Sequence, residues 1–338
     1  MKQSPNAYKL INSIPEYQNF SYHFDYVSII VLITMICFIP SLISTSKTVL
    51  YYHKNSAQNS PNTIHPYVFK SFVYMQVSSI VYTVFDFIIN RIPLTSVFTS
   101  YFSTMTSESP VKHIVAGYYL FEYLSQLFTV LFCLIRLLVF IDSKNYLKVG
   151  TDYLKQNNRQ FQASSLIFRI FSVLSIIICI IVCVPHNLYG VVAIQLDIPF
   201  QYGAIVFTST FSFTNRIQSI GRFIFSGFIT TSIVLLTLTM LWNLKSLKKL
   251  TTISNQSMKA ETTLTITMFL ILIPSVLNLI IILASFFATN YASYTILIRL
   301  ILMDCRVNIV SWYFYWTHPY FKKNTVSKTV NAWSLTNC

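Results

Sequence analysis

The chain has 338 residues, of which 54% are hydrophobic, 16% aromatic and only 10% charged. Soluble domains carry about a quarter charged residues, so this chain has too little polar surface to fold in water. Its formal net charge of +14 would suit nucleic-acid binding only if the basic residues shared one face, and they lie mostly in short gaps between apolar runs. Composition therefore predicts an integral membrane protein that has the lipid bilayer as a partner and no nucleic acid.

The N-terminal segment, residues 1–25, is polar and aromatic and lacks the apolar core of a secretory signal. It contains a glycosylation sequon at Asn19, in the triplet Asn-Phe-Ser. We expect this segment to be extracellular, with Asn19 as a glycosylation candidate. Membrane insertion is then driven by the first apolar run.

Seven apolar runs follow, and each reaches the roughly 20 residues that a helix needs to cross a bilayer. In chain order they are Tyr26–Ser46, Tyr67–Asn90, His113–Ile141, Leu166–Tyr189, Phe223–Leu244, Thr262–Ala288 and Tyr294–Trp316. The seventh run is the weakest, because it contains Arg299, Asp304 and Arg306, and each central charge costs about 2.5–3.5 kcal/mol on insertion. The pattern predicts an all-α fold, a seven-transmembrane helix bundle over residues 26–316, followed by a cytoplasmic C-terminal tail over residues 317–338.

Lysine and arginine residues between the runs predict the orientation of the bundle. With the N-terminus outside, thirteen of them lie in inner segments and six, including Arg91, lie in outer segments. Positive charge favours the cytoplasmic side, so we expect the N-terminus outside and the C-terminus in the cytoplasm. The segment 190–222, between the fourth and fifth runs, is long and rich in aromatic residues, and we expect it to pack over the mouth of the bundle.

Three ionisable residues, Asp86, Glu122 and Arg299, lie in the outer halves of the second, third and seventh runs when each helix rises 1.5 Å per residue. Ionisable side chains inside a membrane usually mark a functional site. If these helices are neighbours, the three side chains together with Tyr123 form a candidate pocket for a small extracellular ligand. The alternative is an ion pair that ties helices together and binds no ligand.

The polar residues of the seventh run fall on two faces. At 3.6 residues per turn, Arg299 and Arg306 share one face, whereas Asp304 and Asn308 share a nearly opposite one. The two sets therefore cannot point into the same gap. Asp304 and Asn308 form either a polar packing core or a monovalent-ion site, and polar packing is the commoner use of such groups.

Arg136, near the inner end of the third run, is a candidate for coupling the bundle to a cytosolic partner. Lys245, Lys248 and Lys249, which follow the fifth run, would supply the rest of that surface. Two alternatives remain open. Arg136 can extend to the inner interface as a long amphipathic side chain, and the lysines can simply set topology and attract anionic lipid.

No motif in the chain predicts catalysis. The six histidines are scattered, and no zinc-protease, serine-hydrolase or phosphate-loop pattern occurs. Cys179 and Cys183 are one helical turn apart but lack the further ligands of a zinc site. We therefore expect no enzyme, no metal site and no cofactor. A small-molecule or ion transporter or channel is the alternative function, because the polar residues of the spans could line a path.

Several short stretches together carry a family resemblance. They are residues 15–22 (PEYQNFSY), 65–69 (HPYVF), 86–93 (DFIINRIP), 134–137 (LIRL), 202–205 (YGAI), 260–265 (AETTLT) and 317–323 (THPYFKK). In this order they resemble the Sru family of nematode serpentine chemoreceptors, which are seven-transmembrane G-protein-coupled receptors. Sibling nematode receptor families are the nearest alternatives. The resemblance implies a receptor in the plasma membrane of sensory cells that binds an unknown small molecule and signals to a heterotrimeric G protein.

The chain departs from the family pattern in its outer loops. The family places a cysteine after the aromatic residue of the first outer loop, whereas the matching residues Tyr101, Phe102 and Ser103 include none, and the long outer segment has none either. The usual disulfide between that segment and the third span therefore cannot form. The Asp-Arg-Tyr triplet of classical receptors is also absent around Arg136.

Overall fold

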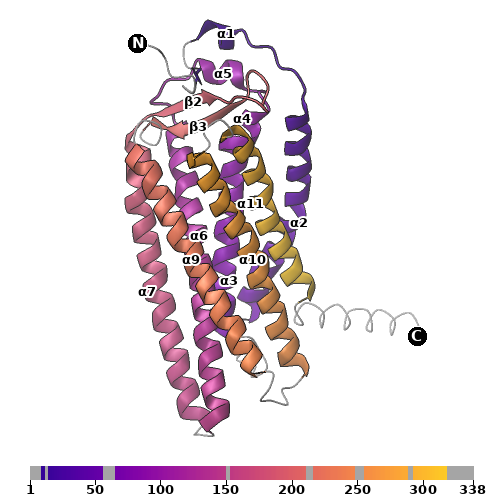
Figure 1. The fold of residues 1–338 in the computed structure, drawn as a ribbon, viewed down its shortest axis with the longest axis vertical. Helices are drawn as coiled ribbons and strands as arrows, with labels where there is room; N and C mark the ends of the chain where they lie inside the picture. The colour runs from indigo at the N-terminus through magenta and orange to yellow at the C-terminus, as the bar shows by residue number, and fades with distance from the viewer. Residues whose placement is uncertain are drawn as a thin grey trace, which may run out of the picture.

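The computed structural model describes residues 9–11, 14–55, 65–149, 153–210, 216–247, 255–287 and 292–317. Long helices that run side by side form most of this part of the chain (Figure 1). They are α2 (Tyr26–Asn55), α3 (Pro66–Asp86), α6 (Val111–Val149), α7 (Tyr153–Leu188), α9 (Arg216–Leu247), α10 (Asn255–Phe287) and α11 (Ala292–Thr317). Each apolar run of the sequence corresponds to one of these helices, so the predicted all-α membrane bundle is confirmed.

Six helical segments of the described chain are long and apolar enough to cross a membrane. They are Tyr26–Lys54, Pro66–Leu94, Val111–Ile141, Gln162–Leu188, Phe223–Asn243 and Thr262–Ile281. The seventh helix, α11, is not among them, and it carries three charged residues. Its 26 residues nevertheless span about 39 Å, which exceeds the hydrocarbon thickness of about 30 Å.

Helix α6 lies at the centre of the bundle, packed against α3, α7 and α9, while α10 and α11 pack against each other. Three buried rings join the core helices: the Phe72 ring of α3 lies 5.6 Å from Phe132 of α6 and 3.9 Å from Phe314 of α11, measured between centroids. Such aromatic side chains bury large apolar areas. They hold α3, α6 and α11 together about 12 Å along α11 from Arg306, toward the C-terminal end of that helix.

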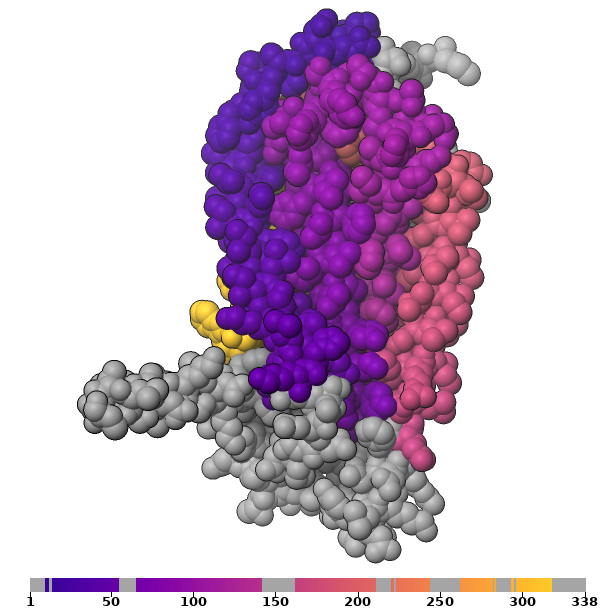
Figure 2. Space-filling view, turned by 180° about the vertical axis from the view of Figure 1, so that it is seen from behind, coloured from indigo at the N-terminus to yellow at the C-terminus, as the bar shows by residue number. Residues whose placement is uncertain are grey.

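Helices α2 and α7 form exposed apolar flanks. Figure 2 shows them along opposite edges of one face of the molecule. Their exposed apolar side chains include Ile29, Leu32, Ile33, Ile36 and Ile39 of α2, and Leu166, Ile170, Val173, Ile177 and Ile181 of α7. A continuous apolar surface of this kind is unfavourable in water. The flanks therefore agree with burial of the bundle in lipid.

A small sheet with two short helices covers one end of the bundle (Figure 1). These elements, together called the lid, are β1 (Lys9–Leu10), β2 (Val191–Gln195), β3 (Ile205–Ser209), α1 (Pro15–Gln18) and α5 (Thr99–Ser103). The strands are antiparallel in the order β1-β2-β3, with Leu10 opposite Ile194 and Ala193 opposite Phe207. The expected packing over the bundle mouth is confirmed for residues 190–210, although the sequence did not predict that they form a hairpin.

Noncovalent contacts hold the lid, and the five cysteines of the described residues are free. The Tyr17 ring stacks on Tyr202 with centroids 4.9 Å apart, and Phe102 meets Phe207 edge-on at 4.5 Å. The first amide of β2 donates to the Ser107 carbonyl at 2.9 Å. Aromatic packing and backbone hydrogen bonds thus connect the long outer segment to α1 and to the loop before α6.

Candidate functional site

The first polar cluster lies where α3 reaches the lid end of the bundle. There the helix continues as a π-helical segment, η1 (Phe87–Arg91), and then as α4 (Ile92–Leu94). Because a π-helix joins residues five apart, Arg91 returns to the side chain of Asp86 and donates from Nε to Oδ2 at 2.7 Å. Arg91 Nη1 also donates to Asp304 Oδ2 of α11 at 2.6 Å. We call these three residues the ion triad.

The prediction that Arg91 lies in an outer segment is wrong, because this residue lies inside the bundle. Arg91 is 1% exposed, and its guanidinium lies over the Phe87 ring, 4.3 Å from the centroid. Asn90 supports the same carboxylate by donating to Asp86 Oδ1 at 2.7 Å. An ordinary helix would separate residues 86 and 91 by more than a third of a turn, so helical-wheel reasoning could not pair them.

The second polar cluster joins α6 to α11. Arg299 Nη2 donates to Glu122 Oε1, and the Arg299 side chain is one-quarter exposed whereas Glu122 is buried. The hydroxyls of Tyr82 and Tyr118, 3.3 Å apart, lie near both charges. The expected group of Asp86, Glu122 and Arg299 is therefore divided into two clusters, because Asp86 bonds to Arg91 rather than to Arg299.

The fourth candidate residue, Tyr123, is buried beside these clusters. Its ring meets Phe225 of α9 edge-on, with centroids 5.0 Å apart. One turn earlier on α6, the Tyr119 ring stacks on His186 of α7 at 4.0 Å. Both tyrosines belong to an apolar cluster that also includes the lid residue Phe207, so the candidate residues lie directly beneath the lid.

The two polar faces of α11 are arranged as its helical geometry predicts. Arg299 and Arg306 both bond to α6, through Glu122 and Thr129. On the other face, Asp304 bonds to Arg91, and Asn308 Oδ1 accepts a hydrogen bond from Ser41 Oγ of α2 at 2.5 Å. Asn308 therefore takes part in polar packing between α2 and α11.

Arg136 does not extend to the interface, and the amphipathic-side-chain alternative is wrong. It is 2% exposed, and its Nη2 donates to Thr265 Oγ1 of α10 at 2.9 Å. The arginine thus joins α6 to α10 toward the end of the bundle away from the lid. Lys245 belongs to the last turn of α9, while Lys248 and Lys249 lie outside the described residues.

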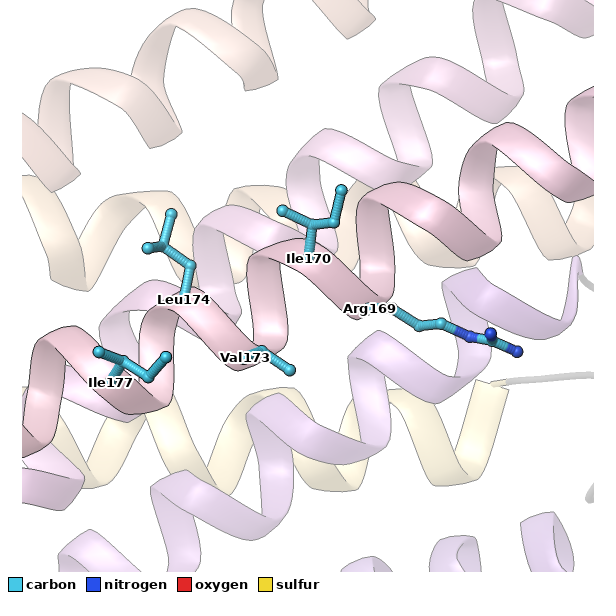
Figure 3. A pocket seen from close by; sticks show the side chains of 5 residues that line it. All are labelled: Arg169, Ile170, Val173, Leu174 and Ile177. Carbon is cyan, nitrogen blue, oxygen red and sulfur yellow. The ribbon is translucent and has the colours of Figure 1, made fainter.

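An apolar hollow on the flank of α7 is unrelated to these clusters. Figure 3 shows its lining, which comes entirely from α7: Arg169, Ile170, Val173, Leu174 and Ile177. The apolar side chains here are exposed, as on a surface that meets lipid. Within the described residues, no group of three or more His, Cys, Asp or Glu side chains could hold a metal ion.

The sequon residue Asn19 lies at the lid end. It ends α1 as its C-cap, and its side chain is exposed. An exposed asparagine is accessible to a modifying enzyme, whereas a buried one is not. Glycosylation at Asn19 stays a prediction.

Apolar flanks, lipid-length helices and internally paired charges together define a multi-pass helical membrane protein. The sequence profile of the family described as serpentine type 7TM GPCR chemoreceptor Sru matches residues 11–324. The chain therefore belongs to this family, as its resemblance implied, and the family is a class of chemoreceptors and not of enzymes. The match includes α11, which identifies it as the seventh helix of the family fold. Comparison with curated proteins returned no significant match.

Proposed function

We propose that this chemoreceptor binds a small extracellular molecule beneath the lid and signals to a heterotrimeric G protein at the other end of the bundle. The observation that carries the proposal is the position of the Glu122–Arg299 pair and the ion triad, which bring polar groups of α3, α6 and α11 together inside an apolar bundle. Ionisable groups are costly in a membrane and are usually retained for function.

The proposed orientation places the lid outside. Residues 1–25 are the extracellular segment, residues 26–316 the transmembrane bundle and residues 317–338 the cytoplasmic tail. The excess of basic residues in the segments opposite the lid supports this orientation, and so does the exposed Asn19. The receptor would then act at the plasma membrane of sensory cells.

Ligand binding acts through the Glu122–Arg299 pair. Arg299 is the more exposed partner, so an incoming polar group reaches it first and competes with Glu122 for its guanidinium. Tyr123 and Asp86 contribute to the walls of the same region. A ligand shifts the balance between two bundle arrangements only by its difference in affinity for them, and separation of α6 from α11 supplies such a difference.

The opposite end of the bundle reports the change. The Arg136–Thr265 hydrogen bond joins α6 to α10, so movement of either helix alters it. Arg136 would then become available to the G protein, and Lys245, Lys248 and Lys249 would attract acidic groups on that partner.

A ligand screen with a G-protein readout tests the proposal. Wild type is compared with Asp86→Asn and Glu122→Gln, and with Glu108→Gln as control, because Glu108 pairs with Lys112 on the surface. The Glu122–Arg299 bond competes with the ligand, and a charged hydrogen bond is worth about 1.5–3 kcal/mol, so its loss in Glu122→Gln should raise ligand potency roughly ten- to hundredfold. The control keeps wild-type potency when surface expression is equal.

Unchanged responses in both site variants would contradict the proposed pocket. The transporter or channel alternative predicts a different result: movement of the ligand or of ions across the membrane, with no dependence on a G protein. Flux measured in the same cells separates the two functions.

A further inference from the structure

Arg306 of α11 is a buried charge that has no carboxylate partner among the described residues. The side chain is 7% exposed. Arg306 lies about 21 Å along a helix of about 39 Å, which is near its middle. Because a guanidinium stays protonated at physiological pH, a positive charge is fixed at the centre of the bundle.

The hydrogen bonding of Arg306 leaves most of its donors unused. Arg306 Nη2 donates to Thr129 Oγ1 of α6 at 2.5 Å, and the Thr129 hydroxyl donates in turn to the Ser125 carbonyl at 2.6 Å. A guanidinium has five N–H groups, so Thr129 accepts only one of them. The hydroxyl also supplies no negative charge.

Every buried carboxylate of the described spans already bonds to another arginine. Asp86 and Asp304 bond to Arg91, and Glu122 bonds to Arg299. An uncompensated charge in low-dielectric surroundings is far more costly than one hydrogen bond to a hydroxyl can offset. The missing negative charge therefore indicates an anion from outside the chain.

Two further side chains that can interact with a charge lie near Arg306. Tyr82 and Cys133 lie close enough to interact with its charge. One guanidinium with a phenol hydroxyl nearby suits a small anion with a single charge.

We propose that Arg306, positioned by Thr129 and with Tyr82 beside it, binds a small monoanion, either chloride or the carboxylate of a short organic acid. The organic-acid form rests on the proposed function, because the acid is then the class of ligand that the receptor detects. Arg299 lies on the same face of α11, about 10.5 Å nearer the lid. It therefore marks the route by which an anion entering beneath the lid reaches Arg306.

Thermal unfolding of the purified full-length receptor in lipid nanodiscs tests this site. The midpoint is measured at constant pH and ionic strength in sodium morpholinoethanesulfonate, whose anion is bulky, in sodium chloride, and in a series of short unbranched carboxylates. For wild type we expect the small anions to raise the midpoint by about 3 °C or more relative to the bulky anion. Arg306→Gln should remove this rise, whereas Arg306→Lys, which keeps the charge, should retain part of it.

The control is Arg169→Gln on the flank of α7, which should respond to anions as wild type does. A rise with chloride alone identifies a resident inorganic ion, and a rise that depends on carboxylate chain length identifies an organic-acid site. Equal wild-type midpoints in all salts would overturn the proposal, even if Arg306→Gln failed to fold. An identical rise in Arg306→Gln would overturn it too. Neither result depends on G-protein signalling, so this site and the proposed function can fail separately.

Discussion

Replacement of Arg91 by methionine is expected to be among the most destabilising single changes in the bundle. Methionine keeps an unbranched apolar stem but removes the guanidinium, which in the wild type lies 2.7 Å from Asp86 and 2.6 Å from Asp304. The two carboxylates then stay buried without their shared cation. Removal of one partner from a buried ion pair costs about 3–5 kcal/mol. The two carboxylates left behind also repel each other.

Asp304→Asn is the informative comparison. The triad contains two carboxylates and one guanidinium, so this change leaves the Asp86–Arg91 pair intact and reduces the net negative charge. We expect a loss of about 1–2 kcal/mol, the value of one hydrogen bond to a charged group. The double variant Arg91→Met/Asp304→Asn should lose less unfolding free energy than the two single variants lose together. It buries one fewer unpaired carboxylate than Arg91→Met alone.

The assay is unfolding of the purified receptor in mixed detergent, followed by tryptophan fluorescence, with Arg169→Met as the matched control on the exposed flank of α7. The control should stay within about 0.5 kcal/mol of wild type. If Arg91→Met lost no more stability than Asp304→Asn, the ion triad would not be the charged centre that joins η1 to α11.

Three further predictions concern packing, the lid and orientation. Gly117→Ala would bring its Cβ to 2.9 Å from the Phe85 ring and should lower the free energy of unfolding by about 1–3 kcal/mol. The control Gly227→Ala would have its nearest atom at 3.9 Å and should be neutral in the same unfolding assay. Gly203 has a φ of +96°, which a residue with a Cβ adopts only with strain. Gly203→Ala should therefore loosen the lid, and the measurement is faster amide hydrogen exchange in β2 and β3. Asn19→Gln should abolish a glycosidase-sensitive shift in gel mobility; a wild-type chain with no such shift would argue against an extracellular N-terminus.

Local sequence patterns determined the spans of this protein. Hydropathy depends on consecutive residues, so it identified all seven long helices in chain order, including α11 despite its charges. Helical geometry along α11 likewise placed Arg299 and Arg306 on one face and Asp304 and Asn308 on another, because that relation depends only on 3.6 residues per turn. The family resemblance needed no structure either.

Only the tertiary structure decided which charges pair. Arg91 and Asp304 are 213 residues apart, and Glu122 and Arg299 are 177 apart, so their contacts depend on which helices are neighbours and how each is rotated. The π-helical turn of η1 changes that rotation and buries Arg91, which the sequence had placed outside. Arg136 is buried against α10 for the same reason: long-range helix packing, and not the local sequence, decides whether an arginine of a span faces lipid, water or another helix.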